Sequence, residues 1–280
     1  MRKGLQILMI YAAIAVAAYL CIITIMYVTQ RNLMYHPDKN LGRPMDSGLP
    51  EMVAVNLTND EGQKVVSWYK SASTNKPTLV YFHGNAGNIG DRHDKVRPFL
   101  DHGIGVMLVG YRGYGNNAGN PTEEGLYSDA ALALDFLSRT GIMPDHWVLY
   151  GESLGSGIAV EMAQRIGTVS PAAALILEAP FSSMADAGKN HYPWLPVNVL
   201  LKDRYDSISK IKSVNTPLLI LHGTADKVVP IELGRKLFNT AVDPKSVHWI
   251  SGAGHDDLFD HGADKMVIDF IERIWARHRS

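Results

Sequence analysis

Short, almost entirely apolar runs that alternate with helical stretches constrain the fold of this chain more than any other feature. Eight β-rich runs are present, and from the third onward they are near-continuously apolar: Met52–Thr58, Lys64–Lys70, Thr78–His83, Gly105–Tyr111, Trp147–Gly151, Ala174–Glu178, Pro217–His222 and Ser246–Ile250. A strand that is apolar on both faces belongs in a sheet covered by helices on both sides, and such sheets are parallel. We therefore expect an α/β fold with an eight-stranded, mostly parallel sheet flanked by helices.

The intervening stretches carry helical periodicity. The predicted helices are Asp91–Leu100, Pro121–Ser138, Leu154–Arg165, Ile231–Ala241 and Ala263–Ala276. For the second of these, the sequence predicts Asn120 as the N-cap, Pro121 in the first turn and Glu123 as the partner in a capping box.

Two segments lack a regular pattern. Residues 31–50 contain three prolines among mixed polar residues, which favours a linker along the domain surface. Residues 182–213 break into proline-rich and aromatic turns around Asn190–Pro196. We interpret this second stretch as a small lid and call it the lid segment.

The amino-terminal segment from Leu5 to Val28 has no charged residue, and Gln6 and Thr24 are its only clearly polar side chains. About 20 such residues span a bilayer as a helix. A cleaved signal peptide has an apolar region of about 7 to 15 residues followed by a small-residue cleavage site. The run is longer and lacks that site, so the sequence favours a transmembrane helix at residues 5–28, with cleavage as the alternative.

Charges on either side of this segment predict its orientation. Arg2 and Lys3 precede the span, and Arg31 is the nearest charge after it. The positive-inside rule then places the amino terminus in the cytoplasm. We expect a single-pass protein with a cytoplasmic tip and anchor at residues 1–32. Its catalytic domain, residues 33–280, would lie on the periplasmic or luminal side.

Composition excludes some function classes. The chain has 27 lysine and arginine residues against 28 aspartate and glutamate residues, so no broad field attracts nucleic acid. Cys21 is the only cysteine, so no intrachain disulfide can form.

The strongest chemical motif is Gly-Glu-Ser-Leu-Gly at 151–155, which follows an apolar strand directly and precedes a helical stretch. This is the strand–turn–helix context of a nucleophile elbow, in which flanking glycines allow a sharp turn. The motif predicts Ser153 as a catalytic nucleophile. The alternative is a tight turn whose serine caps the helix.

A serine hydroxyl needs a base and an acid that orients the base, and in this context they follow the serine in the order acid, then histidine. Asp226 lies in the loop after the apolar strand 217–222, so it is the predicted acid. Weaker candidates lie in the lid segment, where no strand positions them: Asp186, Asp203 and Asp206.

The predicted base is His255, in a glycine-bearing loop after the last strand. His261 lies nearer the next helix, where we expect a solvated surface role. His83 and His222 both precede a glycine at a strand end, and we interpret them as structural residues that hold loop backbone.

Acyl transfer also requires donors aimed at the developing oxyanion. The pattern predicts the main-chain amides of Leu154, after the nucleophile, and Asn85, after the strand at 78–83. A phosphate-binding loop is disfavoured because the P-loop motif is missing.

Together these motifs resemble one branch of the α/β-hydrolase superfamily, the amino-terminally anchored, serine-aminopeptidase-like hydrolases. The resemblance extends from about Leu33 to the carboxyl terminus and rests on the segments Phe82–Asn88, Tyr111–Gly115, Gly151–Gly155, His222–Asp226 and Gly254–His255. The branch includes bacterial membrane hydrolases and is related to eukaryotic protein depalmitoylases. This chain departs from the branch at Asn116–Asn117, because relatives usually have serine directly after the second glycine of the motif at 111–115. It also has a spanning helix where depalmitoylases have a lipidated, cysteine-rich segment.

The resemblance implies a serine hydrolase that cleaves a carboxylic ester or thioester through an acyl-enzyme, with no metal or organic cofactor. Trp194 and its apolar neighbours in the lid segment favour small acyl or lipid-like substrates. Two alternatives stay open. One is a serine peptidase, which would use the same triad, and the other is a noncatalytic, membrane-tethered scaffold.

Overall fold

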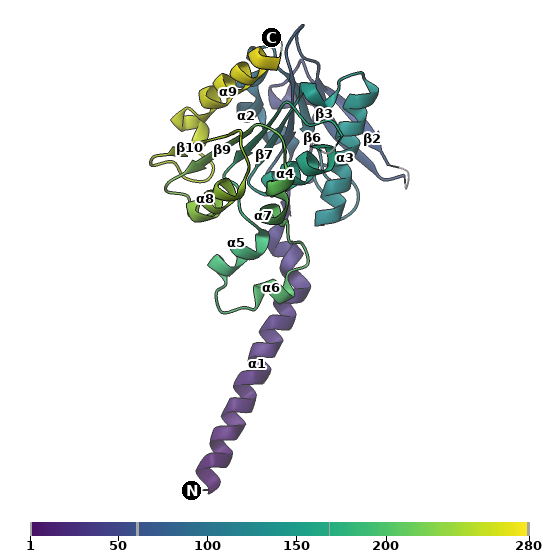
Figure 1. The fold of residues 1–280 in the computed structure, drawn as a ribbon. Coiled ribbons are helices and arrows are strands. Elements are labelled where there is room, and N and C mark those ends of the chain that lie inside the picture. Colours follow the sequence, from purple (N-terminus) through teal and green to yellow (C-terminus); the bar gives the residue numbers. More distant parts are fainter. Residues whose placement is uncertain (1, 60–61, 168, 279–280) are drawn as a thin grey trace.

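An eight-stranded sheet between two layers of helices forms the body of the protein, and one long helix projects from it (Figure 1). The structure, a computed structural model, describes residues 2–59, 62–167 and 169–278. The strands run in the order β10-β9-β8-β7-β4-β6-β3-β2. Their bounds are β2 Val53–Thr58, β3 Lys64–Lys70, β4 Thr78–Phe82, β6 Gly105–Val109, β7 Trp147–Glu152, β8 Ala174–Glu178, β9 Leu218–Gly223 and β10 Lys245–Ile250. All eight predicted strands are confirmed.

Six neighbouring strands, β10-β9-β8-β7-β4-β6, are parallel, and β3 is antiparallel to both β2 and β6. Every residue of β4, β6 and β8 is buried, which is why these strands read as continuous apolar runs. Because β4, β7, β8 and β9 are parallel neighbours, the loops that follow them meet at one edge of the sheet.

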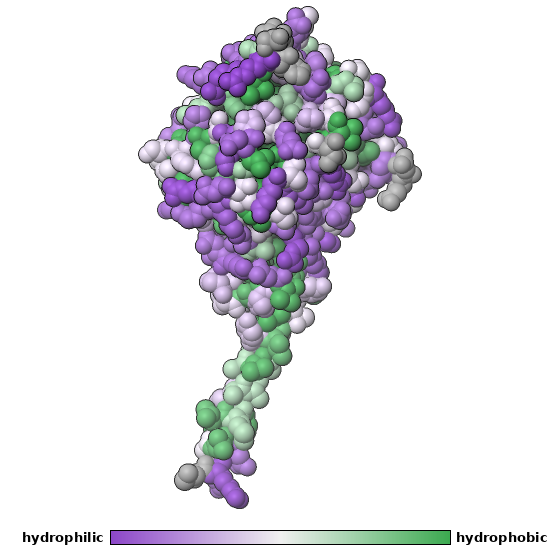
Figure 2. Space-filling view, viewed as in Figure 1, coloured by the Kyte–Doolittle hydropathy of each residue, from purple (hydrophilic) through white to green (hydrophobic). Residues whose placement is uncertain are grey.

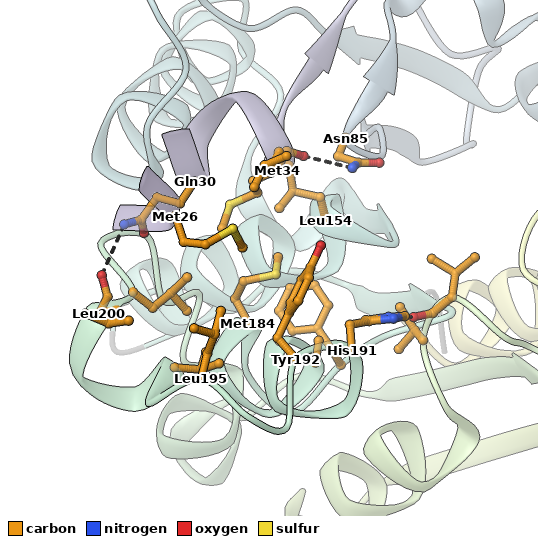
Figure 3. A pocket seen from close by; sticks show the side chains of 18 of the residues that line it. Met26, Gln30, Met34, Asn85, Leu154, Met184, His191, Tyr192, Leu195 and Leu200 are labelled. Carbon is orange, nitrogen blue, oxygen red and sulfur yellow. Dashed lines mark hydrogen bonds between the residues drawn. The ribbon is translucent and has the colours of Figure 1, made fainter. Parts of the chain in front are cut away.

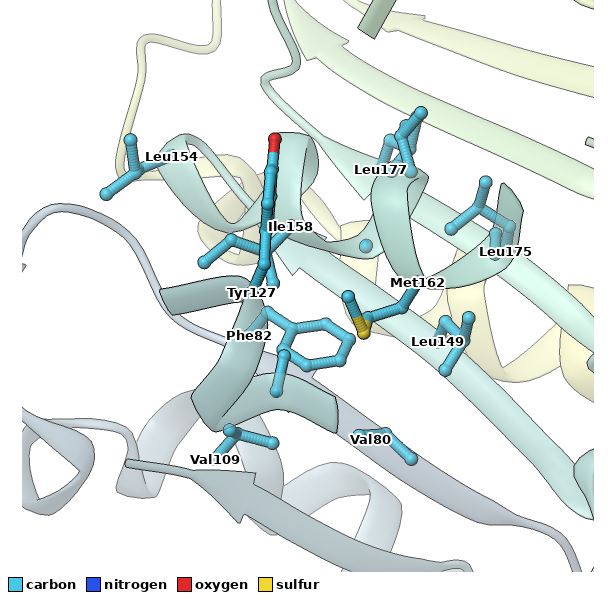
Figure 4. Close-up of a cluster of buried hydrophobic side chains, with 14 of the residues drawn as sticks. Val80, Phe82, Val109, Tyr127, Leu149, Leu154, Ile158, Met162, Leu175 and Leu177 are labelled. Atoms are coloured by element: carbon cyan, nitrogen blue, oxygen red, sulfur yellow. The ribbon is translucent and has the colours of Figure 1, made fainter. Parts of the chain in front are cut away.

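Helices cover both faces of the sheet. One core cluster lies beneath α3 (Glu123–Arg139), α4 (Leu154–Gly167) and α8 (Ile231–Thr240), and part of it is drawn in Figure 4. A second cluster lies beneath α2 (His93–Asp101) and α9 (Ala263–His278). Each fully buried leucine or isoleucine contributes about 1.5–3 kcal/mol. The two clusters therefore hold the strand ends, and the loops after them, in fixed positions.

The start of α3 differs from its prediction. The N-cap is Thr122, whose hydroxyl accepts a hydrogen bond from the Gly125 amide at 3.0 Å, so the predicted start at Pro121 with Asn120 as cap is wrong. The predicted capping box is wrong as well. The Glu123 carboxylate instead accepts hydrogen bonds from outside its own first turn, among them the main-chain amides of Arg204 and Tyr205. A tertiary contact with the lid segment has taken the place of the local one.

The projecting helix α1 spans Arg2–Met34 and contains no buried residue. Among the described residues it is the one helix long and apolar enough to cross a membrane. The predicted linker from residue 31 is wrong over its first four residues, because α1 continues to Met34. The chain then forms β1 (His36–Pro37), which pairs in parallel with β5 (Ala86–Gly87).

The lid segment lies where α1 meets the body, beneath the sheet in Figure 1. It contains α5 (Met184–His191), α6 (Val197–Leu200), α7 (Ser207–Lys210) and the 3₁₀ turn η4 (Ile211–Ser213). The other short 3₁₀ turns are η1 (Pro44–Ser47), η2 (Ile89–Asp91), η3 (Pro144–His146) and η5 (Leu258–His261). In Figure 2 the surface becomes largely hydrophobic from this neck downward along α1.

Candidate active site

Ser153 lies in the sharp turn between β7 and α4, with a φ of +51° that a non-glycine residue rarely adopts. The flanking glycines are required by space. A Cβ on Gly151 would lie 2.4 Å from the carbonyl oxygen of Gly155, and one on Gly155 would lie 2.0 Å from that of Phe82. The turn therefore has the geometry expected of a nucleophile elbow, and strained backbone of this kind is typical of functional sites.

His255 links the serine to the predicted acid. Its Nε2 lies 2.9 Å from the Ser153 Oγ, and its Nδ1 lies 2.7 Å from Oδ2 of Asp226. The three residues come from the loops after β7, β9 and β10, at the same edge of the sheet. With the Nδ1 proton donated to Asp226, Nε2 is free to accept the proton of the serine hydroxyl.

The pKa values of Asp226 and His255 are shifted in the directions that a catalytic acid and base require. Burial acts to raise the pKa of Asp226, but hydrogen bonds from His222, His255 and the Val229 amide outweigh it and hold that pKa below its usual range. Burial acts to lower the pKa of His255, but the hydrogen bond to Asp226 and the negative charge of Asp226 raise it. Asp226 is thus a carboxylate at neutral pH, and it stabilises the imidazolium that forms when His255 takes a proton.

The rival residues have other partners. Asp203 pairs with Arg31, and Asp186 with Lys236. His261 is exposed at the surface, as predicted, with Asp257 3.9 Å away.

The two predicted structural histidines do bind loop backbone. His83 is 2.8 Å from the carbonyl of Gly84, and His222 is 2.8 Å from that of Val229. Burial lowers the pKa of His83 to about 3, so this ring is neutral.

Asn85 and Leu154, the predicted oxyanion donors, line the same cavity as Ser153. Hydrogen bonds of Asn85 hold its loop from two sides. The main-chain carbonyl of Asn85 accepts from the His36 amide at 2.9 Å and from the Tyr114 hydroxyl at 2.8 Å. The Asn85 side chain donates to the carbonyl of Met34, the last residue of α1, at 2.8 Å. No sequence pattern predicts this link between α1 and the loop, because the two residues are 51 positions apart.

The loop at 111–117 braces the Asn85 loop, and the unusual Asn117 takes part. Its side chain accepts from the Val66 amide at 2.8 Å and donates to the Tyr111 carbonyl at 3.1 Å. The Tyr111 hydroxyl in turn donates to the carbonyl of His83 at 3.2 Å. Asn117 thus fastens this loop to β3.

A buried polar network behind the elbow was missed by sequence reasoning. Glu152 accepts from the Tyr81 hydroxyl at 2.6 Å and lies 3.5 Å from Arg92, while Glu178 binds Lys95 and the Tyr150 hydroxyl. Two carboxylates and two cations therefore balance in the interior. The network is attached to the nucleophile turn because the Ser153 amide donates to the main-chain carbonyl of Glu178 at 2.9 Å.

A cavity of about 300 Å³ extends from Ser153 between α1 and the lid segment (Figure 3). Its walls are mostly apolar, and Met26, Met34, Met184 and Leu195 are among the side chains that form them. None of the described residues that line it is an aspartate, glutamate, lysine or arginine. The reactive group thus faces a site built for an apolar group.

Comparisons with known proteins find similar sequences and structures over most of the chain. The family described as serine aminopeptidase, S33, matches residues 73–204 and 200–262. The uncharacterised protein Rv2307c of Mycobacterium tuberculosis is 35% identical over 268 residues, which cover 93% of each chain. The lysophosphatidylserine lipase ABHD12 of Danio rerio is 30% identical over 251 residues, covering 83% of this chain and 62% of the lipase. An esterase structure from Pyrococcus furiosus superposes with a TM-score of 0.68 at 18% identity, covering 86% of this chain and 98% of the esterase.

Proposed function

Because the chain belongs to the serine aminopeptidase, S33, family of α/β-hydrolases, we propose that it cleaves carboxylic esters or thioesters with Ser153, Asp226 and His255 as its catalytic triad. The observation that carries the proposal is His255, which lies within hydrogen-bonding distance of both the serine hydroxyl and the buried carboxylate.

The reaction proceeds in two steps. His255 Nε2 takes the proton of the Ser153 hydroxyl as Oγ attacks the substrate carbonyl, and the resulting oxyanion faces the amides of Asn85 and Leu154. His255 then protonates the departing alkoxide or thiolate, which leaves an acyl-serine. In the second step His255 deprotonates water, the hydroxide attacks the acyl carbonyl, and the proton returns to Ser153 as the carboxylic acid departs.

The cavity favours an ester over a peptide with a free amino terminus. An aminopeptidase binds the ammonium group of its substrate with a carboxylate, and the cavity lining described above contains none. The names of the relatives agree, since one is a lipase and one structural neighbour is an esterase. An ester with an apolar acyl group is the substrate class that fits best.

In this proposal α1 anchors the enzyme in a membrane through residues 5–28, and residues 33–280 form the catalytic domain with residues 182–213 as its lid. The charges of Arg2 and Lys3 put the catalytic domain on the non-cytoplasmic side. A reporter fused to the carboxyl terminus should be active only outside the cytoplasm, and cytoplasmic activity would reverse the orientation.

A fluorophosphonate probe tests the nucleophile. The full-length wild-type protein should be labelled and should hydrolyse p-nitrophenyl acetate, and Ser153→Ala should lose both properties. Ser156→Ala is the matched control, because Ser156 is a buried serine one turn further along the same segment. Undiminished turnover in Ser153→Ala would refute the nucleophile assignment.

The same assay separates the alternatives. Faster cleavage of aminoacyl anilides than of esters would favour a peptidase, and no turnover of any ester, thioester or anilide by the wild type would favour a scaffold.

A further inference from the structure

We propose that α1 is part of the substrate site as well as an anchor: its last turns form one wall of the acyl pocket, and a single acyl chain reaches Ser153 from the bilayer along that wall. This inference rests on the proposed hydrolase function. It predicts that residues of α1 contact the substrate, whereas a helix that served only as an anchor would not.

The first observation is the side of α1 that meets the cavity. Met26, Gln30, Leu33 and Met34 line it, and their spacing of four, three and one places them on one face of the helix. In Figure 3 the side chains of Met26 and Met34 lie opposite those of Met184 and Leu195 in the lid segment. Unbranched methionine side chains adapt to flexible apolar ligands. The outer part of the pocket therefore lies between the helix and the lid segment.

The second observation is that this wall is fixed to the body. The Gln30 side chain donates to the Leu200 carbonyl at 3.1 Å and accepts from the Lys202 amide at 2.8 Å. Arg31 forms two hydrogen bonds, of 2.7 and 2.9 Å, with the buried carboxylate of Asp203. With the bond from Asn85 to the end of α1, these contacts hold the helix on both sides of the pocket. A helix that served only as a tether would need none of them.

The third observation is the depth at which the lid segment meets the helix. The Tyr19 hydroxyl donates to the main-chain carbonyl of Trp194 at 2.9 Å. The predicted span ends at Val28, which lies about 14 Å along the helix beyond Tyr19, so Tyr19 lies inside the apolar layer. The tip of the lid segment therefore enters the leaflet next to the domain.

The exposed residues of that tip fit this position. Three large apolar side chains are exposed there, Tyr192, Trp194 and Val199, and Val199 keeps 82% of its surface accessible. Tyrosine and tryptophan are the residues that favour membrane interfaces. Figure 2 shows a hydrophobic surface along α1 just below the neck, and a mixture of hydrophobic and weakly polar residues where the lid segment meets the helix. The opening between the two walls thus faces lipid, and an acyl chain can enter it without crossing water.

Size and charge define the occupant. At about 300 Å³ the cavity is at the lower end of the range of about 300–1,000 Å³ for ligand pockets, which suits one acyl chain better than two. Since no aspartate, glutamate, lysine or arginine lines it in the part of the chain that the structure describes, it holds the apolar chain rather than a charged headgroup. The substrate is therefore a membrane-resident amphiphile with a single ester-linked or thioester-linked chain.

The test compares two tryptophan substitutions on opposite faces of α1, in the full-length protein in phospholipid nanodiscs. Met26→Trp fills the pocket wall, whereas Val28→Trp adds the same side chain to a lipid-facing position that is 69% exposed. The readout is kcat/KM for p-nitrophenyl laurate divided by kcat/KM for p-nitrophenyl acetate. We expect Met26→Trp to lower this ratio about tenfold, as pocket changes of a methylene or more do. Val28→Trp should leave it unchanged.

Met26→Ala provides a second, opposite change that removes bulk from the wall, and it should shift the preferred acyl chain towards greater length. It decides the matter if the tryptophan variant does not fold. Ratios that stay at the wild-type value in both Met26 variants, or a ratio that falls as far in Val28→Trp, would overturn the wall. Loss of the Ser153 dependence of acetate turnover would overturn the proposed function instead, so the two failures are distinguishable.

Discussion

Replacing Asp226 by asparagine should disable the base while leaving the loop in place. Oδ1 of Asp226 accepts hydrogen bonds from the amides of Val228 and Val229, both at 2.8 Å. In Asp226→Asn the amide oxygen takes that position, because only an acceptor fits opposite two N–H donors. The amide nitrogen then faces Nδ1 of His255 and donates to it. The ring proton of His255 is then held on Nε2, which faces Ser153. Nε2 can no longer accept the proton of the serine hydroxyl.

The expected loss in kcat is about ten-thousand-fold, the size seen when a triad aspartate becomes asparagine, which corresponds to about 5.5 kcal/mol in the barrier. Turnover of p-nitrophenyl acetate by purified wild type and variant measures it directly. The labelling rate with a fluorophosphonate should fall in parallel, because the same proton transfer activates the nucleophile. A variant that keeps a tenth or more of the wild-type kcat would show that Asp226 is not the acid.

Stability separates the chemical effect from unfolding. Asp226→Asn keeps the acceptor for both amides, so its thermal midpoint should stay close to that of the wild type. Asp226→Ala leaves the amides of Val228 and Val229 without this acceptor, at a cost of about 1–3 kcal/mol for the buried Val229 amide and less for the partly buried Val228 amide. If the asparagine variant unfolds at the same lowered temperature as the alanine variant, the inferred orientation of the amide is wrong.

Three further predictions follow from other contacts. Gly155→Ala places a Cβ 2.0 Å from a main-chain oxygen of β4 and should lower the free energy of unfolding by about 3 kcal/mol or more. Gly167→Ala, in the same helix with open space around it, should not lower it. Equal thermal midpoints for the two variants would contradict the close approach at Gly155. Arg31→Ala leaves its buried carboxylate partner without a cation and should lower the free energy of unfolding by about 1–3 kcal/mol. Arg43→Ala, whose ion pair is exposed, should leave the thermal midpoint nearly unchanged, and equal midpoints for the two variants would argue against the docking of α1. His255 acts as a base only when it is neutral, and the Asp226 carboxylate raises its pKa. The value of kcat/KM should therefore fall as the pH drops through a midpoint above about 6.5, the ordinary pKa of histidine. A pH–rate profile with a lower midpoint would contradict this effect of Asp226.

Much of the site could be predicted because its parts are encoded locally. An apolar run that ends in a glycine-bearing loop marks a strand end, and parallel strands bring such ends to one edge. Ser153, Asp226 and His255 each follow a strand in this way, and the structure brings them within hydrogen-bonding distance of one another. The buried ion pairs of Glu152 and Glu178 carry no such signal, because a charged residue within a strand gives no indication of which distant cation will neutralise it.

The strands, the elbow turn and the apolar helix at the amino terminus can be predicted from local sequence, since each depends on burial or backbone space within a few neighbouring residues. The position of that helix against the body depends instead on long-range contacts. Arg31 and Asp203 are 172 residues apart, and Tyr19 and Trp194 are 175 apart, so no local pattern selects them as partners. Their pairing depends on the shape that the folded body offers to the helix. The same pairing brings the helix alongside the lid segment and creates the apolar pocket that leads to Ser153.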